Sequence, residues 1–147
     1  MAFDWVYYIT LAERLKDAAE TLKDEGEPDF QQACLRSAIS RAYYGAFCMA
    51  RNLLLKKGVE IRRDHVHKFV MDKYVNAGDD DVKKVGENLK RLWGKRIQAD
   101  YRDEMNIKEG KDKSELEVVE RHIKKAHNTA TRIRDLESLA LLSFSED

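Results

Sequence analysis

The chain is poor in the residues that break helices or cross-link them. Its 147 residues include one proline, seven glycines and two cysteines. Cys34 and Cys48 lie inside helical patterns, and their spacing matches neither a zinc site nor a disulfide framework, so we expect a reduced, cytoplasmic protein. No apolar run approaches the ~18 residues of a membrane span, and Asp4 stands where a signal peptide would carry positive charge. We therefore expect neither secretion nor membrane insertion.

An excess of charge of one sign is also absent, because 27 Lys and Arg balance 27 Asp and Glu. The field of the whole chain gives no argument for binding nucleic acid or an anionic membrane, so any such site must be a local patch. Hydrophobic residues make up 43% of the chain, which is enough for one core. We expect a single domain over residues 1–147, with the tail from Ser143 frayed.

Scarce proline and glycine, with almost no alternation of β-branched residues, predict long helices joined by short turns. Apolar residues recur at steps of three and four, and the predicted helices cover about 5–25, 28–57, 64–75, 80–101 and 114 onward. Gly26 and Gly58 end the first two, while Asp79 and Ser114 cap the last two. Residues 103–113, which include Gly110, are predicted as a loop. The fold class is therefore all-α, a bundle of about five helices, in which the apolar stripe of the last helix is either core or a dimer seam.

Standard enzyme motifs are missing, since there is no Gly-rich phosphate loop, no HExxH and no GxSxG. His65 and His67 are two residues apart, so on a helix they point in different directions and are poorly placed to share a metal. We interpret both as solvated residues at a helix start, and His122 and His127 as surface residues. The sequence thus predicts neither a metal site nor a cofactor.

The end of the fourth helix carries the main candidate site, which consists of Arg96, Asp100 and Tyr101. Arg96 could bind a phosphate through two charge-assisted hydrogen bonds, Tyr101 could donate from its hydroxyl, and Asp100 could orient either group or act as a base. The alternative is structural. Arg96 and Asp100 would form a local ion pair, and Tyr101 would be a core aromatic whose hydroxyl reaches the surface.

A basic run surrounds that candidate site. Between residues 83 and 102 there are seven Lys and Arg against two acidic residues. Arg91 and Lys95 belong to this run and could form a rim that attracts phosphate. A charge run is also typical of a helix face that water solvates.

Two segments of the chain resemble the signatures of the HEPN superfamily of small helical bundles. Arg36-Ser37-Ala38-Ile39-Ser40-Arg41-Ala42-Tyr43-Tyr44-Gly45-Ala46-Phe47 carries SAxxRAYYxAF, and Arg96-Ile97-Gln98-Ala99-Asp100-Tyr101 carries RxxADY. Both are similar to the short, free-standing prokaryotic branch, and the resemblance covers nearly the whole chain. It implies an up-and-down bundle that forms a homodimer, with two copies of the Arg motif facing each other across a cleft.

The same resemblance suggests a function. Many such proteins are metal-independent endoribonucleases, and several are toxins paired with a small nucleotidyltransferase antitoxin. Carried over onto this chain, Arg96 takes the Arg position of the nuclease signature and Tyr101 the His position. The chain departs from the pattern at Ile97, where a polar residue is usual, and at Tyr101. Tyrosine, with a pKa of ~10, is a poor base, although it can donate a hydrogen bond or act as an acid.

The first signature also has two interpretations. Tyr43 and Tyr44 could pack against neighbouring helices while Arg36 and Arg41 pair with carboxylates, or Arg41 and Tyr44 could line the cleft beside Arg96.

Three hypotheses follow for the whole chain. The first is a toxin-type endoribonuclease acting at a dimer cleft. The second is a non-catalytic module that binds RNA or a nucleotide, or that partners a nucleotidyltransferase. The third is a structural helical dimer.

Overall fold

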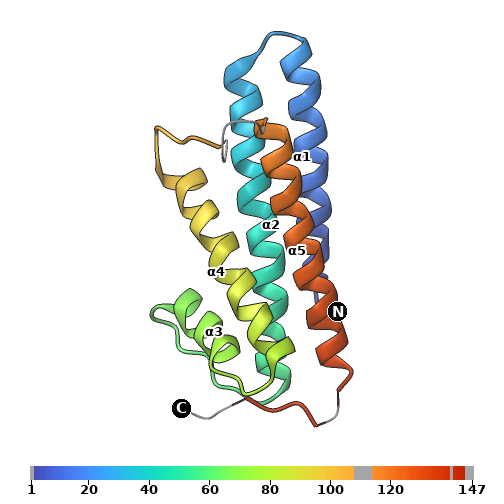
Figure 1. Ribbon diagram of the computed structural model, residues 1–147, viewed down its shortest axis with the longest axis vertical. Helices are drawn as coiled ribbons and strands as arrows, with labels where there is room; N and C mark the ends of the chain where they lie inside the picture. The colour runs from blue at the N-terminus through green and yellow to red at the C-terminus, as the bar shows by residue number, and fades with distance from the viewer. Residues whose placement is uncertain (1, 108–113, 140, 145–147) are drawn as a thin grey trace.

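The computed structural model describes residues 2–107, 114–139 and 141–144, and these residues form five helices and no strand. The helices are α1 (Val6–Asp24), α2 (Pro28–Lys56), α3 (Val66–Val75), α4 (Asp80–Tyr101) and α5 (Glu115–Glu137). Figure 1 shows α1, α2, α4 and α5 running alternately up and down the long axis, with the short α3 at one end. The prediction of an all-α, up-and-down bundle of about five helices is therefore confirmed.

Left-handed glycines end the first two helices, as predicted. Gly26 has a φ of 73° and Gly58 a φ of 82°. After α1, the N–H of Gly26 donates to the carbonyl of Lys23 at 3.2 Å, and the N–H of Glu27 donates to Leu22 at 3.0 Å. This Schellman motif satisfies carbonyls that the end of a helix leaves without partners, and the same pattern follows α2 at Gly58. Local sequence thus sets where both helices end.

Side-chain caps begin α4 and α5. Asp79 Oδ1 accepts a hydrogen bond of 2.8 Å from the backbone N–H of Asp81. Ser114 Oγ accepts one of 3.2 Å from the N–H of Glu117. Both bonds satisfy donors in the first turn of a helix, and both predicted caps are confirmed.

The third helix begins at Val66, two residues later than the predicted start at Asp64. The reason is His65, whose φ of 51° is the only positive value at a non-glycine position among the described residues. Side chains other than glycine rarely adopt this left-handed conformation, because it brings Cβ close to the backbone. The bend at His65 turns the chain so that the first turn of α3 meets α2.

The central helix is α2, which packs against each of the other four helices. Its small residues permit close approach to α1, since a Cβ at Gly45 would lie 2.6 Å from Ile9 Cγ1 and 3.0 Å from the carbonyl oxygen of Trp5. The apolar stripe of α5 belongs to the core of this chain, where Val119 and Ala126 are fully buried. Of the two alternatives for that stripe, core or dimer seam, the structure therefore shows core.

Two segments outside the helices also contact the core. The predicted loop 103–113 is described only as far as residue 107, so Gly110 lies outside the described residues. Ile107 is buried within that first part. Phe144 packs edge to face on Tyr74 with ring centroids 5.0 Å apart, whereas the rest of the tail predicted to fray, residues 145–147, is not described. No helix in the described part of the chain has the length and apolar character needed to cross a membrane.

Candidate functional site

The two signature segments meet across the packed faces of α2 and α4. Residues 36, 40 and 44 lie one helical turn apart and therefore share one face of α2. Each of the three contacts the last turns of α4: Arg36 bonds its end, Ser40 bonds Asp100, and Tyr44 bonds Arg96. α2 and α4 therefore lie side by side, and of the two residues that could line the cleft beside Arg96, Tyr44 does so.

Arg96 is the centre of this contact and is 8% exposed. Its Nη2 donates to the hydroxyl of Tyr44 at 2.5 Å and to that of Tyr101 at 3.4 Å. Its guanidinium carbon lies 4.9 Å from the ring centroid of Tyr44 and 5.3 Å from that of Tyr101. The guanidinium is therefore held between two phenol rings whose electron-rich faces attract a cation.

Asp100 holds the same guanidinium from its other side. Its Oδ2 accepts hydrogen bonds from Arg96 Nε at 2.8 Å and from Ser40 Oγ at 3.0 Å. Burial alone would lower the pKa of Arg96, but Tyr44 and the Asp100 carboxylate outweigh it, so the pKa of Arg96 is raised and the group stays charged. With these two bonds, Asp100 has the contacts of a group that positions Arg96.

Arg36 fixes the end of α4 to which Asp100 and Tyr101 belong. Its Nη1 donates to the backbone carbonyl of Arg102 at 2.5 Å, and its Nη2 donates to that of Asp103 at 2.9 Å. A cation on these last carbonyls also complements the partial negative charge at a helix C-terminus. The expectation that Arg36 pairs with a carboxylate is wrong, because the final turn of α4 presents backbone oxygens at that position.

A histidine that the sequence did not select lies beside this cluster. Nδ1 of His67, at the start of α3, is 2.6 Å from the hydroxyl of Tyr43. Its ring stacks on Phe47 with centroids 4.4 Å apart and meets the Tyr44 ring edge to face at 5.9 Å. Burial, and then the charge of Arg96, lower the pKa of His67. The interpretation of His67 as solvated is wrong, because the left-handed residue two positions earlier turns the start of α3 toward α2, which no local sequence pattern indicates.

Other predicted site residues lie elsewhere. Arg41 places its guanidinium carbon 5.3 Å from the ring centroid of Tyr8, so it contacts α1 and is not part of the Arg96 cluster. Tyr101 is 69% exposed, which contradicts its interpretation as a core aromatic. Arg91 and Lys95 line a groove of about 520 Å³ between α4 and α5. Five Lys and Arg side chains line this groove, three from α4 and two from α5. The groove residues are Lys90, Arg91, Gly94, Lys95, Gln98, Val118, Arg121, His122 and Lys125.

His122 corrects a further expectation. It is 7% exposed, and its Nε2 lies 3.0 Å from the carbonyl oxygen of Ile39 on α2. The interpretation of His122 as a surface residue is therefore wrong, because the apolar stripe of α5 turns this position toward α2. His127 is partly exposed and pairs with Glu13 at 2.5 Å.

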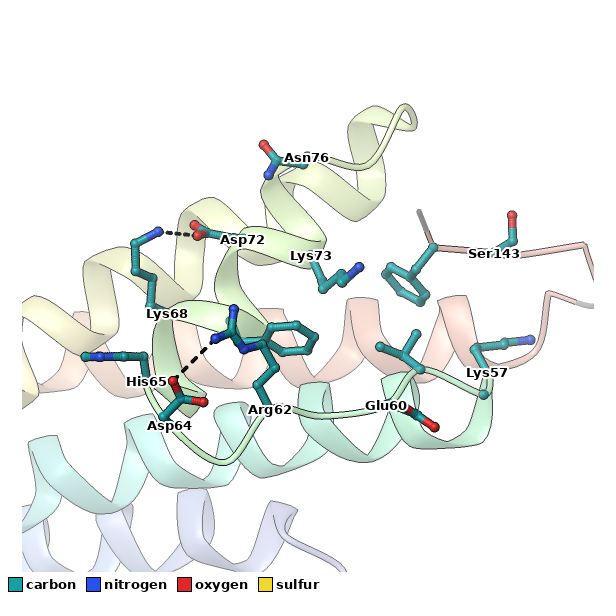
Figure 2. Close-up of a pocket in the computed structure, with 14 residues that line it drawn as sticks. Lys57, Glu60, Arg62, Asp64, His65, Lys68, Asp72, Lys73, Asn76 and Ser143 are labelled. Atoms are coloured by element: carbon teal, nitrogen blue, oxygen red, sulfur yellow. Dashed lines mark hydrogen bonds and ion pairs between the residues drawn. The ribbon is translucent and has the colours of Figure 1, made fainter. Parts of the chain in front are cut away.

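A hollow of about 1000 Å³ lies between α3 and the connection that precedes it, and Ser143 and Phe144 also line it. Figure 2 shows that two of its cations turn toward acidic neighbours: Lys68 pairs with Asp72 at 2.5 Å and Arg62 with Asp64 at 3.3 Å. These cations are neutralised within the chain.

Metal-binding groups do not converge in the described part of the chain, where no set of three or more His, Cys, Asp and Glu side chains is placed to share an ion. Comparison with known proteins gives one family. The model of the HEPN domain matches residues 12–137, a span that contains both signature segments and the whole cluster around Arg96. Among curated proteins none matches the chain.

Proposed function

Because the chain belongs to the HEPN domain family, we propose that it is a metal-independent endoribonuclease whose Arg96 binds the scissile phosphate. The observation that carries this proposal is the geometry of Arg96. The guanidinium is oriented by Asp100 on one side and bordered by the hydroxyls of Tyr44 and Tyr101 on the other. The guanidinium is thus held in one orientation before a phosphate arrives, and such preorganised charge is usually the largest source of transition-state stabilisation.

The chemistry assigned to each group follows from its contacts. Cleavage proceeds by attack of the ribose 2′-oxygen on phosphorus, and Arg96 stabilises the negative charge that builds up on the phosphoryl oxygens. Tyr101 is the most exposed group of the cluster, and its hydroxyl lies 3.4 Å from Arg96 Nη2. It is placed to give its proton to the departing 5′-oxygen, which is the acid role that a phenol can fill.

The groove between α4 and α5 supports RNA as the ligand over a lone nucleotide. Arg91 and Lys95 lie on α4 together with Arg96, and the groove adds Lys90, Arg121 and Lys125. Positive side chains arranged along a surface attract the phosphates of the nucleotides on either side of the cleaved bond. An RNA strand that crosses α4 from the Arg96 cluster would contact the Lys and Arg side chains of this groove.

The partners that the family resemblance implies belong to the same proposal. We place two protomers with their Arg96 clusters facing across a dimer cleft, and a small nucleotidyltransferase as the antitoxin that holds the toxin inactive. Tyr101, at 69% exposure, is the side chain of the cluster that such a cleft would cover.

The test is incubation of purified protein with total RNA in EDTA. We expect wild type to leave 2′,3′-cyclic phosphate and 5′-hydroxyl ends, and Arg96→Ala to cleave about 100- to 1000-fold more slowly, the usual loss when a charge-stabilising donor is removed. Arg132→Ala is the matched control, because Arg132 is a half-exposed arginine of α5 whose nearest acid, Asp81, is 3.6 Å away. Intact RNA with wild type would overturn the nuclease and leave a binding module, which gel shifts with the same variants would then detect.

A further inference from the structure

His67 brings an imidazole to a site whose signature lacks one. It belongs to α3, outside both signature segments, yet it packs on the same Tyr44 ring that Arg96 contacts. We propose that His67 is the catalytic base of the RNA cleavage described above, in place of the histidine that Tyr101 replaces. The inference rests on the proposed nuclease function and adds a residue to it.

The His67 ring is held on two sides by α2. Tyr43 fixes Nδ1 through the 2.6 Å hydrogen bond, and Phe47 supports one face of the ring at 4.4 Å. Burial raises the pKa of Tyr43 far above its usual range, so that hydroxyl stays a neutral phenol. When Nδ1 carries the hydrogen and donates it to the Tyr43 oxygen, Nε2 keeps its lone pair, and no described residue forms a hydrogen bond with Nε2.

The surroundings favour the neutral, basic form of His67 before substrate binds. The titratable groups that face it are Tyr43 and Tyr44 from α2 and Arg96 from α4. None of them is a carboxylate that would stabilise a proton on the ring. A phosphate bound at Arg96 reverses this balance, because its negative charge offsets the guanidinium and stabilises the imidazolium that forms. His67 is thus a free base in the empty site and a better proton acceptor once RNA is bound.

The proton and electron movements balance with residues of this chain alone. The 2′-hydroxyl gives its proton to Nε2 of His67, and its oxygen forms a bond to phosphorus. The bond from phosphorus to the 5′-oxygen breaks, its electron pair goes to that oxygen, and the oxygen takes the proton of Tyr101. The imidazolium then loses a proton to water and the phenolate regains one, leaving a cyclic phosphate and a 5′-hydroxyl.

The experiment compares four proteins on a labelled mixed-sequence RNA in EDTA: wild type, His67→Gln, His65→Asn and Arg96→Ala. His65→Asn is the matched control, since His65 is exposed, lies outside the cluster and has a left-handed φ of 51° that asparagine tolerates. We expect His67→Gln to cleave at least ~100-fold more slowly, as for loss of a general base. Its affinity for 2′-O-methyl RNA, which lacks the nucleophile, should stay within twofold of wild type.

The rate against pH separates a catalytic role from a structural one. In wild type the rate should fall as pH drops through the pKa of His67, and His67→Gln should lack this acidic limb. If His67→Gln fails to fold, Tyr43→Phe is the deciding variant. It removes only the hydroxyl that hydrogen-bonds Nδ1, and with Nδ1 as the donor its loss should move the limb to lower pH. An unmoved limb in Tyr43→Phe would overturn the role of His67.

The two proposals fail in different ways. If wild type cleaves, Arg96→Ala does not, and folded His67→Gln cleaves within threefold of wild type, then His67 is not the base and the nuclease function stands. If wild type leaves the RNA intact under all conditions, both proposals are overturned.

Discussion

Three neighbours hold the Arg96 side chain in place before any ligand binds. Asp100 accepts from Nε, and the hydroxyls of Tyr44 and Tyr101 accept from Nη2. An arginine side chain free in water loses rotamer entropy when it grips a phosphate, and here that loss has already occurred on folding. The arrangement gives a physical reason why the two signatures come together: one supplies the cation and its carboxylate, the other supplies the surface that orients them.

The lowered pKa of His67 makes stability depend on pH at the residue scale. In the unfolded chain this imidazole titrates near 6.5, and in the folded chain it titrates lower because of burial and Arg96. The unfolded state therefore binds more protons in that range, and wild type should lose stability as pH falls below about 6.5. His67→Gln should lack this part of the decline. Urea midpoints of both proteins between pH 7.5 and 5 measure it, and parallel curves would contradict the assignment.

The sequence predicted the proximity of the candidate site residues better than it predicted their surroundings. Arg96, Asp100 and Tyr101 share the last turns of one helix, so their proximity follows from spacing alone, as does the ion pair at 2.8 Å. The contact of His67 depends on a left-handed residue two positions earlier and on how α3 meets α2. No local pattern encodes either of these, because long-range packing decides them.

At the scale of elements, two glycines of α4 test how closely the helices pack. A Cβ at Gly86 would lie 2.6 Å from the backbone nitrogen of Val75 on α3, whereas Gly94 has nothing within 4 Å of such a Cβ. We expect Gly86→Ala to destabilise the fold by about 1–3 kcal/mol, because the backbone of α3 must shift. Gly94→Ala should stabilise it by about 0.5–1 kcal/mol, the usual gain in a helix interior. Urea unfolding measures both.

This pair is internally controlled, since both glycines lie on the same helix. Equal effects of the two substitutions would show that α4 does not approach α3 as closely as described.

Helix boundaries were predictable where a side chain or a glycine fixes them locally. Gly26, Gly58, Asp79 and Ser114 each act within a few residues, and the helices begin or end where these residues indicate. The start of α3 shifted because His65 is not a residue that usually signals a left-handed turn. The burial of His122 was missed for a related reason, since its helix face is identified only once α2 is seen against α5.

At the scale of the whole molecule, the proposed cleft requires two protomers. A separate apolar surface lies at the start of α1, where Phe3, just before the helix, Tyr7 and Leu11 are 52%, 62% and 40% exposed. Sedimentation velocity at micromolar concentration should show a dimer, and RNA cleavage per protomer should fall when the protein is diluted below the dimer dissociation constant. A monomer at micromolar concentration, or activity unchanged on dilution, would contradict a site formed at a dimer cleft.

The position of α3 at one end of the bundle has a consequence for dynamics. Among the described helices, α3 contacts only α2 and α4, whereas α2 contacts all the others. Segments with few neighbours open by sub-global fluctuations well below the free energy of global unfolding, so backbone amides of α3 should exchange with solvent deuterium earlier than those of α2. Each opening would carry His67 away from Tyr43. The lifetime of the contact between His67 and Tyr43 would then be set by the local opening of one short helix. Phe144 restrains that helix through its contact with Tyr74.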